Sequence, residues 1–241
     1  MTTARIAELL QPFLGAQKLS PAQLSAISIY IDILGRWNAR INLTAVRNPE
    51  EIVARHFGES LFAARHLFPA STSAATVEAL EVPPRSPVSP VVNAFEPACA
   101  LKTSKVADLG SGAGFPGLPI KLWAPHISLT LIESNHKKAI FLREVVRALT
   151  LTDVDIQNAR AETLPASSYD VVTLRAVERF EAILPVAASL AANDGRLALL
   201  IGVAQLPPLR TALPLHNIAA PLPIPSSSSR ILAIAQRRSE E

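Results

Sequence analysis

The chain has 241 residues, of which 49% are hydrophobic, and a formal net charge of +3 at pH 7. This length fits one domain, or one domain with a small appendage, and the composition excludes a disordered chain. Cys99 is the only cysteine, which excludes a disulfide framework and a cysteine-based metal site. Residues 1–8 carry no signal core, and no apolar run is long enough to cross a membrane, so we expect a soluble, cytoplasmic protein.

The first 68 residues predict helices, which we expect to form an N-terminal cap. The predicted helices cover residues 4–14, 20–37 and 48–66. The second begins with Ser20 as N-cap, Pro21 at the first helical position and Gln23 completing a capping box. The polar stretch 38–44 predicts an irregular segment.

Residues 69–104 are rich in Pro, Ser and Ala and keep no regular period, apart from room for a short helix over 75–80. We interpret them as an insertion or linker. The expected organisation is therefore the cap over 1–68, the insertion over 69–104 and an α/β core over 105–241.

From residue 105 onward, predicted strands and helices alternate. Strands are expected over 105–109, 127–132, 154–157, 169–174 and 196–201, and helices over 116–123, 137–149 and 179–190. This alternation predicts a mostly parallel sheet with helices on both faces. Two further strands, predicted over 216–220 and 230–235, would add an antiparallel C-terminal edge and make seven strands.

A glycine loop follows the first predicted strand, between Asp108 and Gly117, and holds four of the nine glycines. A strand, a tight turn and a helix N-terminus are the usual way in which an α/β sheet binds a nucleotide-like ligand. The part from Gly112 onward matches the G-x-G-x-x-G pattern of dinucleotide sites. However, the turn begins at Gly110, two residues after the acid Asp108. This register favours S-adenosylmethionine, whose sulfonium and ammonium groups suit a nearby carboxylate.

Three charged residues follow other strands of the predicted sheet. Glu133 ends the second strand, where a carboxylate can accept hydrogen bonds from ribose hydroxyls, or can simply be solvated. Glu162, next to Ala161, follows the third strand, where an adenine edge would lie. Arg175 ends the fourth strand and should point into the crevice, because ligands bind at the carboxyl ends of such strands. There its guanidinium could bind a phosphate or carboxylate, or pair with a loop acid.

Motifs in two separate parts of the chain resemble the RsmG (GidB) family, bacterial methyltransferases that act on guanine N7 of small-subunit ribosomal RNA. The core motifs are Gly110–Ile120, Leu131–Ser134, Lys137-Lys138 and Arg175-Ala176, and the cap motifs are Trp37-Asn38, Asn42–Thr44, Arg55-His56 and Glu59-Ser60. The resemblance covers roughly the whole chain apart from the insertion and is weaker after Gly202. It implies a class I S-adenosylmethionine-dependent methyltransferase fold, Rossmann-like and α/β, with the helical cap in addition.

The resemblance implies that certain residues contact S-adenosylmethionine or shape its pocket, namely Gly110, Phe115, Ala161, Glu162 and Arg175. Together with the residues singled out above, the expected cofactor site comprises Asp108, Gly110, Gly112, Gly114, Phe115, Glu133, Ala161, Glu162 and Arg175. The chain departs from the family pattern at Ile201, where Lys is usual, and at Glu59, where Asp is usual.

Methylation of guanine N7 does not require the protein to supply a catalytic base. Guanine N7 has a free lone pair, so proximity and alignment suffice, and we assign no catalytic base and no metal. The nucleophilic cysteine that a cytosine-C5 enzyme needs is missing from the core, because Cys99 lies in the insertion. The sequence after Arg175 also lacks the Asn/Asp-Pro-Pro-aromatic pattern of adenine-N6 enzymes.

We expect the partner to be ribosomal RNA or the small ribosomal subunit. We also expect the protein to be a monomer. Candidate RNA-binding cations, each of which could instead be a solvated surface charge, are Arg36, Arg40, Arg47, Arg55, His56, Arg65, Lys121, Lys137 and Lys138. The substrate-binding prediction is Arg55, His56, Lys137 and Arg175. Trp37 could stack on a base or belong to the core. Three other functions stay open: a methyltransferase with another substrate, a nicotinamide-dependent oxidoreductase, and a non-catalytic RNA-binding protein.

Overall fold

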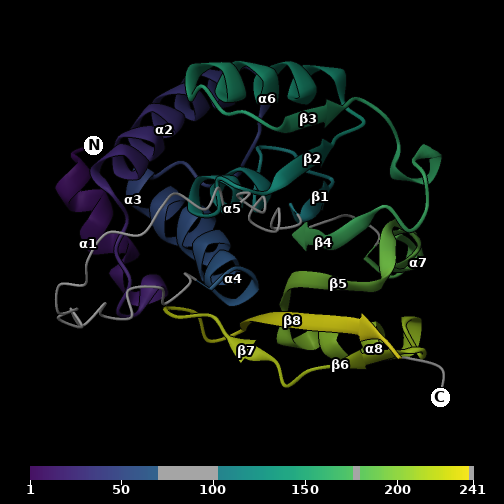
Figure 1. Ribbon diagram of the computed structural model, residues 1–241. Coiled ribbons are helices and arrows are strands. Elements are labelled where there is room, and N and C mark those ends of the chain that lie inside the picture. Colours follow the sequence, from purple (N-terminus) through teal and green to yellow (C-terminus); the bar gives the residue numbers. More distant parts are fainter. Residues whose placement is uncertain (70–102, 176–179, 239–241) are drawn as a thin grey trace, which may run out of the picture.

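The computed structural model describes residues 1–69, 103–175 and 180–238. The helices of the first 69 residues pack against an α/β sheet formed by the rest of the described chain (Figure 1). Nearly all of the predicted insertion lies outside the described residues, including Cys99 and the helix predicted over 75–80. The positions of Ala176 and Val177 also lie outside them.

The cap consists of α1 (Thr3–Leu14), α2 (Pro21–Ile41), α3 (Pro49–Ile52), the π-helix η1 (Val53–Gly58) and α4 (Glu59–Leu67). The capping box of α2 is confirmed, because the Ser20 side chain accepts from the Gln23 N–H and the Gln23 side chain from the Ser20 N–H. The prediction that residues 38–41 are irregular is wrong. The Asn38 side chain exchanges two hydrogen bonds with the backbone of Thr44, which lets α2 continue to Ile41.

The helix predicted over 48–66 is not one regular helix. Its middle, η1, carries Arg55 and His56 in a π-helical segment between α3 and α4. Such π-helical segments are rare and often occur at functional sites. Hydrophobic periodicity does not reveal this one, because residues 56–64 are all buried and therefore show no one-sided pattern.

The strands are β1 (Lys105–Leu109), β2 (Ser128–Ile132), β3 (Val154–Gln157), β4 (Tyr169–Arg175), β5 (Ala191–Gly202), β6 (His216–Ile218), β7 (Leu222–Pro223) and β8 (Arg230–Arg237). Within the described residues they form one eight-stranded sheet with the order β3-β2-β1-β4-β5-β8-β6, in which β7 also pairs with β8. The first five strands in this order are parallel, and β8, β6 and β7 form an antiparallel edge. The predicted seven strands are present, and the two-residue β7 is additional.

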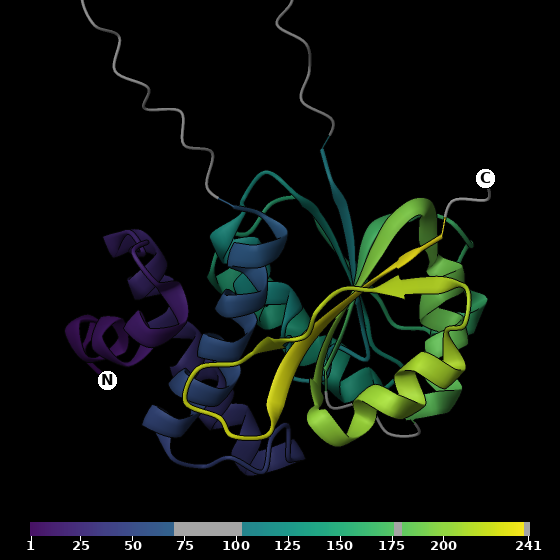
Figure 2. The same ribbon diagram turned by 90° about the horizontal axis from the view of Figure 1, so that it is seen from below.

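Both faces of the sheet are covered (Figure 2). The core helices are α5 (Gly117–Trp123), α6 (His136–Ala148), α7 (Phe180–Leu190) and α8 (Leu206–Ala212), with short 3-10 turns η2 (Ala161–Thr163) and η3 (Val203–Gln205). Alternate residues of β5 show the two layers: Leu200 packs with the cap, α5 and α6, whereas Leu199 packs with α7 and α8. Sequence patterning predicted α5, α6 and α7 but not α8, which contains two prolines in seven residues.

The strand order reverses between β1 and β4, which are neighbours in the sheet although two strands separate them in the chain. In open α/β sheets, ligands bind in the crevice outside the carboxyl ends of the strands at such a switch point. Gly110 follows β1 and Arg175 ends β4, so both lie at this point. Among the helices that the structure describes, none is both long and apolar enough to span a membrane.

Candidate functional site

Two cavities, each of about 450 Å³, meet at Gly110. The first, here the Glu133 cavity, is lined by Leu109, Gly110, Ile132, Glu133, Ser134, Ala159, Arg160, Ala161, Glu162 and Ile183. The second, here the His56 cavity, is lined by Leu43, Thr44, Ala45, Val46, Glu51, Arg55, His56, Gly110, Ser111, Gly112, Ala113, Phe115, Lys138, Arg175 and Arg230. The glycine loop therefore separates a site between the strand ends from a site between the loop and the cap.

The loop glycines at 110, 112 and 114 all have positive φ, of 70°, 54° and 84°. They differ in what they face. A Cβ on Gly112 would have no neighbour closer than the Gly110 carbonyl oxygen at 3.7 Å. A Cβ on Gly114 would collide with the Tyr30 hydroxyl and lie 2.6 Å from Leu118 Cδ1. Gly112 thus leaves open space beside the cavity, whereas Gly114 allows the loop to pack against the cap.

Asp108 was expected to face the cofactor, but its side chain lies under the loop and lines neither cavity. Its Oδ1 accepts a hydrogen bond from Thr173 Oγ1 at 2.9 Å, and its Oδ2 accepts from the Gly117 N–H at 3.1 Å. Burial raises the pKa of the Asp108 carboxyl to about 6. The carboxyl therefore fastens the loop to β4 and to the start of α5.

Glu133 supports the loop from the next strand. Its Oε2 accepts a hydrogen bond from the Gly112 N–H at 2.9 Å, and its Oε1 accepts from the Asn135 N–H at 2.7 Å. The residue is only 7% exposed, yet it lines the Glu133 cavity together with Ala161 and Glu162 of η2. The structure therefore brings together the two carboxylates and the alanine that were expected around an adenosine.

Phe115 joins the loop to the cap. Its ring stacks on Tyr30 with a centroid distance of 5.3 Å, and it contacts His56 at 4.9 Å and Phe57 at 5.0 Å. The buried Tyr30 hydroxyl also donates to the Ala113 carbonyl oxygen. One aromatic cluster thus fixes both the loop and the wall of the His56 cavity.

Arg175 lies almost buried at the end of β4. Its Nη2 donates to the Arg55 carbonyl oxygen at 2.8 Å and to His56 Nδ1 at 2.9 Å. It also lies 3.3 Å from Glu59 Oε2, which accepts from Arg230 Nε at 3.0 Å. Burial lowers the pKa of Arg175 to about 10, so it remains charged at neutral pH. Arg175 therefore pairs with an acid of the cap helix α4, where a loop acid was expected, and it also lines the His56 cavity.

His56 is buried and neutral. Its Nε2 lies 2.7 Å from Thr44 Oγ1. Burial, together with the charge of Arg175, lowers the pKa of His56 to about 3. It was predicted as an RNA-binding cation, and the structure instead gives it an uncharged ring inside a hydrogen-bonded chain.

The predicted cations differ in whether they line a cavity and whether they are exposed. Arg55 lines the His56 cavity with a half-exposed side chain that pairs with Glu51 at 2.8 Å. Lys138 also lines it, whereas Lys137, which was preferred from the sequence, lines neither cavity. Lys121 is only 2% exposed, and its Nζ donates to the carbonyl oxygens of Pro125 and Ile127 at 2.8 and 2.6 Å. The RNA-binding prediction for Lys121 is therefore wrong.

Trp37 belongs to the packing between α2 and α6. Its ring meets Phe141 edge to face at 5.9 Å, and its Nε1 donates to Glu144 Oε2 at 2.8 Å. This supports the core interpretation of Trp37. Ile201 is likewise buried in β5, beside Ile231 of β8, on the face that α7 and α8 cover.

Among the residues of the His56 cavity that sequence reasoning missed are Thr44, Glu51 and Arg230. Thr44 belongs to the Asn42–Thr44 motif and could have been proposed from it. Glu51 precedes Arg55 by one helical turn, a spacing that indicates a surface ion pair as readily as a site. Arg230 follows Arg175 by 55 residues, and no local pattern connects the two.

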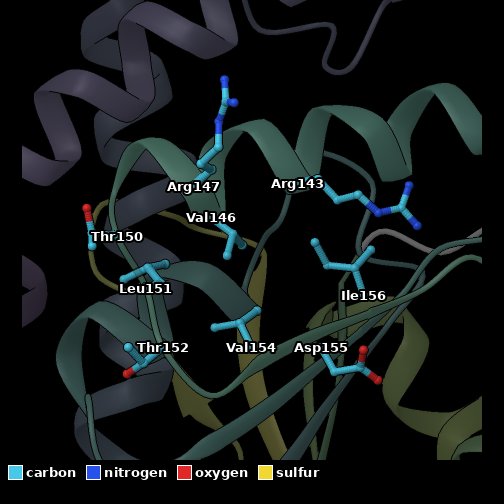
Figure 3. Close-up of a pocket in the computed structure, with 9 residues that line it drawn as sticks. All are labelled: Arg143, Val146, Arg147, Thr150, Leu151, Thr152, Val154, Asp155 and Ile156. Atoms are coloured by element: carbon cyan, nitrogen blue, oxygen red, sulfur yellow. The ribbon is translucent and has the colours of Figure 1, made fainter.

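A separate groove of about 480 Å³ lies between α6 and the edge strand β3 (Figure 3). The apolar side chains of Val146, Leu151 and Val154 lie between the two elements, while Arg147 points away. This groove shares no residue with the Glu133 and His56 cavities. In the described part of the chain, no group of three His, Cys, Asp or Glu side chains is placed to hold a metal.

A mostly parallel sheet with a glycine loop after β1, an acid after β2 and an antiparallel edge formed by β8 and β6 fits the class of the Rossmann-like, class I S-adenosylmethionine-dependent methyltransferases. The solved structure of ribosomal protein L11 methylase from Lactobacillus delbrueckii subsp. bulgaricus is similar to this chain in its fold. Its TM-score is 0.54 with 15% identity, over 77% of this chain and 80% of that chain, which shows a common fold.

The family model described as rRNA small subunit methyltransferase G (GidB) matches residues 23–76 and 89–212. A relative named ribosomal RNA small subunit methyltransferase G from Xylella fastidiosa (strain M23) is 32% identical, over 92% of this chain and 90% of its own length. Another of that name, from Xanthomonas euvesicatoria pv. vesicatoria (strain 85-10), is 34% identical over 86% and 85%. The chain belongs to this family of S-adenosylmethionine-dependent rRNA methyltransferases, so the predicted family, fold, enzyme class and cofactor are confirmed.

Proposed function

We propose that this protein transfers the methyl group of S-adenosylmethionine to N7 of a guanine in small-subunit (16S) ribosomal RNA. The observation that carries this proposal is the pair of cavities on the two sides of Gly110. One contains the carboxylates Glu133 and Glu162, which suit a nucleoside bearing positive charge. The other contains four cationic side chains, which suit a polyanion.

The loop fits the cofactor because Gly112 leaves open space where any side chain would intrude. We assign the cofactor to the backbone of Gly110 and Gly112 and to Glu133, Ala161 and Glu162, with Phe115 and Arg175 at its border to the second cavity. When bound, S-adenosylmethionine supplies a methyl group on a positively charged sulfur. Asp108 and Gly114 hold the loop in shape from below.

The chain's own residues bind and orient the two reactants. Guanine N7 needs no deprotonation, so the protein does not have to move a proton. This agrees with His56, the best-placed imidazole, whose two nitrogens are both engaged by protein groups. Rate enhancement then comes from holding N7 in line with the methyl group.

For the RNA, the contributing cations are Arg55, Lys138, Arg175 and Arg230, which line the His56 cavity. We infer that the partner is ribosomal RNA or the assembled small subunit. We propose that the protein acts as a monomer, and a ribosomal substrate supports a place in the cytoplasm.

The test is transfer of labelled methyl from S-adenosylmethionine to small ribosomal subunits that lack the modification. Incorporation should map to a single guanine, which borohydride and aniline cleavage at N7-methylguanosine identifies. The matched variant Gly112→Val should lose cofactor affinity and incorporation, because its side chain fills the open space beside Gly112. Cofactor binding without incorporation into RNA would favour a methyltransferase with another substrate. RNA binding without cofactor binding would favour the non-catalytic alternative.

A further inference from the structure

Thr44 lies in the wall of the His56 cavity, three residues after the end of α2. Its backbone is held by both atoms of the Asn38 amide, with an Asn38 Nδ2 bond to the Thr44 carbonyl oxygen of 3.0 Å and a Thr44 N–H bond to Asn38 Oδ1 of 2.9 Å. The position of the Thr44 side chain is therefore fixed by helix α2 of the cap.

The hydrogen bonds of His56 have a fixed direction. A guanidinium has only donors, so His56 Nδ1, which lies 2.9 Å from Arg175 Nη2, must accept. The pKa of His56 is lowered to about 3, so the ring is neutral and carries one proton. That proton is on Nε2, which donates to Thr44 Oγ1 at 2.7 Å.

The Thr44 oxygen is then fully used as an acceptor. It receives the His56 Nε2–H and also the Val46 N–H, at 3.1 Å. A hydroxyl has two acceptor positions and one proton, so only the proton remains to be shared. Among the described residues, no acceptor for that proton lies within hydrogen-bond distance. Arg175 and His56 thus convert a hydroxyl that could serve in both directions into a directed donor at the cavity.

We infer that the Thr44 hydroxyl donates a hydrogen bond to O6 of the target guanine and thereby selects guanine. This inference rests on the proposed function. O6 is the acceptor next to N7 on the same edge of guanine, whereas adenine has an amino donor at that position. A fixed donor therefore favours guanine and opposes adenine beside the atom to be methylated. His56 is a positioning residue, because it acts on the base only through Thr44.

The experiment compares two small subunits, reconstituted with 16S rRNA that carries either guanine or 2-aminopurine at the methylated position. 2-Aminopurine keeps N7 and lacks O6. We expect Thr44→Val to lower kcat/KM for the guanine subunit about tenfold and to leave that for the 2-aminopurine subunit nearly unchanged, since a single hydrogen bond is worth about that factor. The guanine preference therefore falls about tenfold, while Thr44→Ser, which keeps the hydroxyl, retains it.

An unchanged guanine preference in Thr44→Val would overturn the inference. A higher Kd for S-adenosylmethionine in the same variant would then place the donor on the cofactor. Failure of the wild-type protein to methylate the guanine subunit would contradict the proposed function instead, so the two failures are distinguishable.

The positioning role of His56 has its own readout. His56→Gln keeps an N–H donor on a side chain of similar reach, whereas His56→Leu removes it. We expect His56→Leu to lower the guanine preference by less than Thr44→Val does, because the hydroxyl remains but is no longer directed, and we expect the double variant to lower it no further than Thr44→Val alone. Additive losses would contradict a chain that acts through Thr44. If His56→Leu does not fold, as thermal unfolding would show, the Thr44 pair still decides.

Discussion

Gly112 and Gly114 are two residues apart and both have positive φ, but they have different structural roles. Gly112 borders open space at the cavity, and Gly114 packs under Tyr30 and Leu118. A sequence pattern does not distinguish the two glycines. It shows that each lacks a side chain, but it does not show what lies beside the Cα atom.

Alanine at each position should separate the two roles. Both substitutions carry a similar strain of about 1–2 kcal/mol, since alanine disfavours the left-handed region. Gly114→Ala should lose a further ~1–3 kcal/mol of unfolding free energy through overpacking, whereas Gly112→Ala should mainly weaken S-adenosylmethionine binding. Urea unfolding and isothermal titration calorimetry measure the two effects. Equal losses of stability, with equal affinity, would contradict this division.

His56 predicts how stability depends on pH. Its pKa is about 3 in the folded protein and near 6.5 in the unfolded chain, so the unfolded chain binds more protons between these values and stability falls as pH drops. Asp108, with its pKa raised to about 6, acts in the opposite direction. Comparison with His56→Gln isolates the histidine. From about pH 7 to about pH 5, wild type should lose about 2 kcal/mol more than the variant. Parallel curves from urea unfolding would show that His56 is not buried as described.

At this scale the sequence indicated residue types more reliably than orientations. Glu133 and Glu162 follow from their places after strands, because strand ends converge at one edge of the sheet. The burial of Lys121 and of the Asp108 side chain depends on neighbours from distant segments, such as Ile127 and Thr173. No local spacing encodes these contacts.

Helix α2 connects the cap to the loop through Tyr30, which stacks on Phe115 and donates to the Ala113 carbonyl oxygen. We therefore expect the contacts of Tyr30 to affect both the stability of the cap and the conformation of the cofactor loop.

Tyr30→Phe removes only the hydroxyl and leaves the buried Ala113 carbonyl oxygen without this donor. We expect a loss of ~1–3 kcal/mol in unfolding free energy and weaker S-adenosylmethionine binding. Trp37→Phe is the matched control, because it removes a hydrogen bond of the same helix, to Glu144, away from the loop. It should affect stability without affecting cofactor affinity. Equal affinities in both variants would show that the loop does not depend on Tyr30.

The elements predicted well are those with strong local signals. Strands β1 and β3 match their predicted bounds because apolar runs between turn signals define them. The π-helix η1 and the two-residue β7 were missed, since the first runs into a stretch that is buried on all sides and the second exists only by pairing with β8. The beginning of β5 at Ala191 was missed for the same reason, because its pairing with Tyr169 comes from the sheet.

The whole molecule has a modest net charge of +3, yet four cationic side chains line one cavity. This clustering of cationic side chains, and not the net charge, is what supports the proposed RNA site. The family model covers residues 23–76 and 89–212, so the family and class could be predicted from motifs, whereas Arg230 lies beyond the matched range.

Binding to ribosomal RNA should depend on salt. Each phosphate contact that is lost lowers the slope of log K against log salt by roughly 0.7–0.9. Lys138→Ala and Arg55→Ala should each lower the slope by about this amount. Lys105→Ala, at the opposite end of β1, should leave it unchanged. Filter binding across a salt series measures these slopes. A slope insensitive to Lys138 and Arg55 would place the RNA elsewhere on the molecule.

Glu59 lies between Arg175 and Arg230, and so joins the cap, β4 and β8. A ribosome synthesises these three segments in the order of the chain, with Arg230 last. Until Arg230 is added, Glu59 has one guanidinium partner instead of two, and β5 lacks its neighbour β8. The His56 cavity, which Arg230 lines, is therefore complete only after β8 has left the ribosome. In the proposed function this cavity binds ribosomal RNA, so the enzyme would gain its RNA site only when nearly all of the described chain has left the ribosome that makes it.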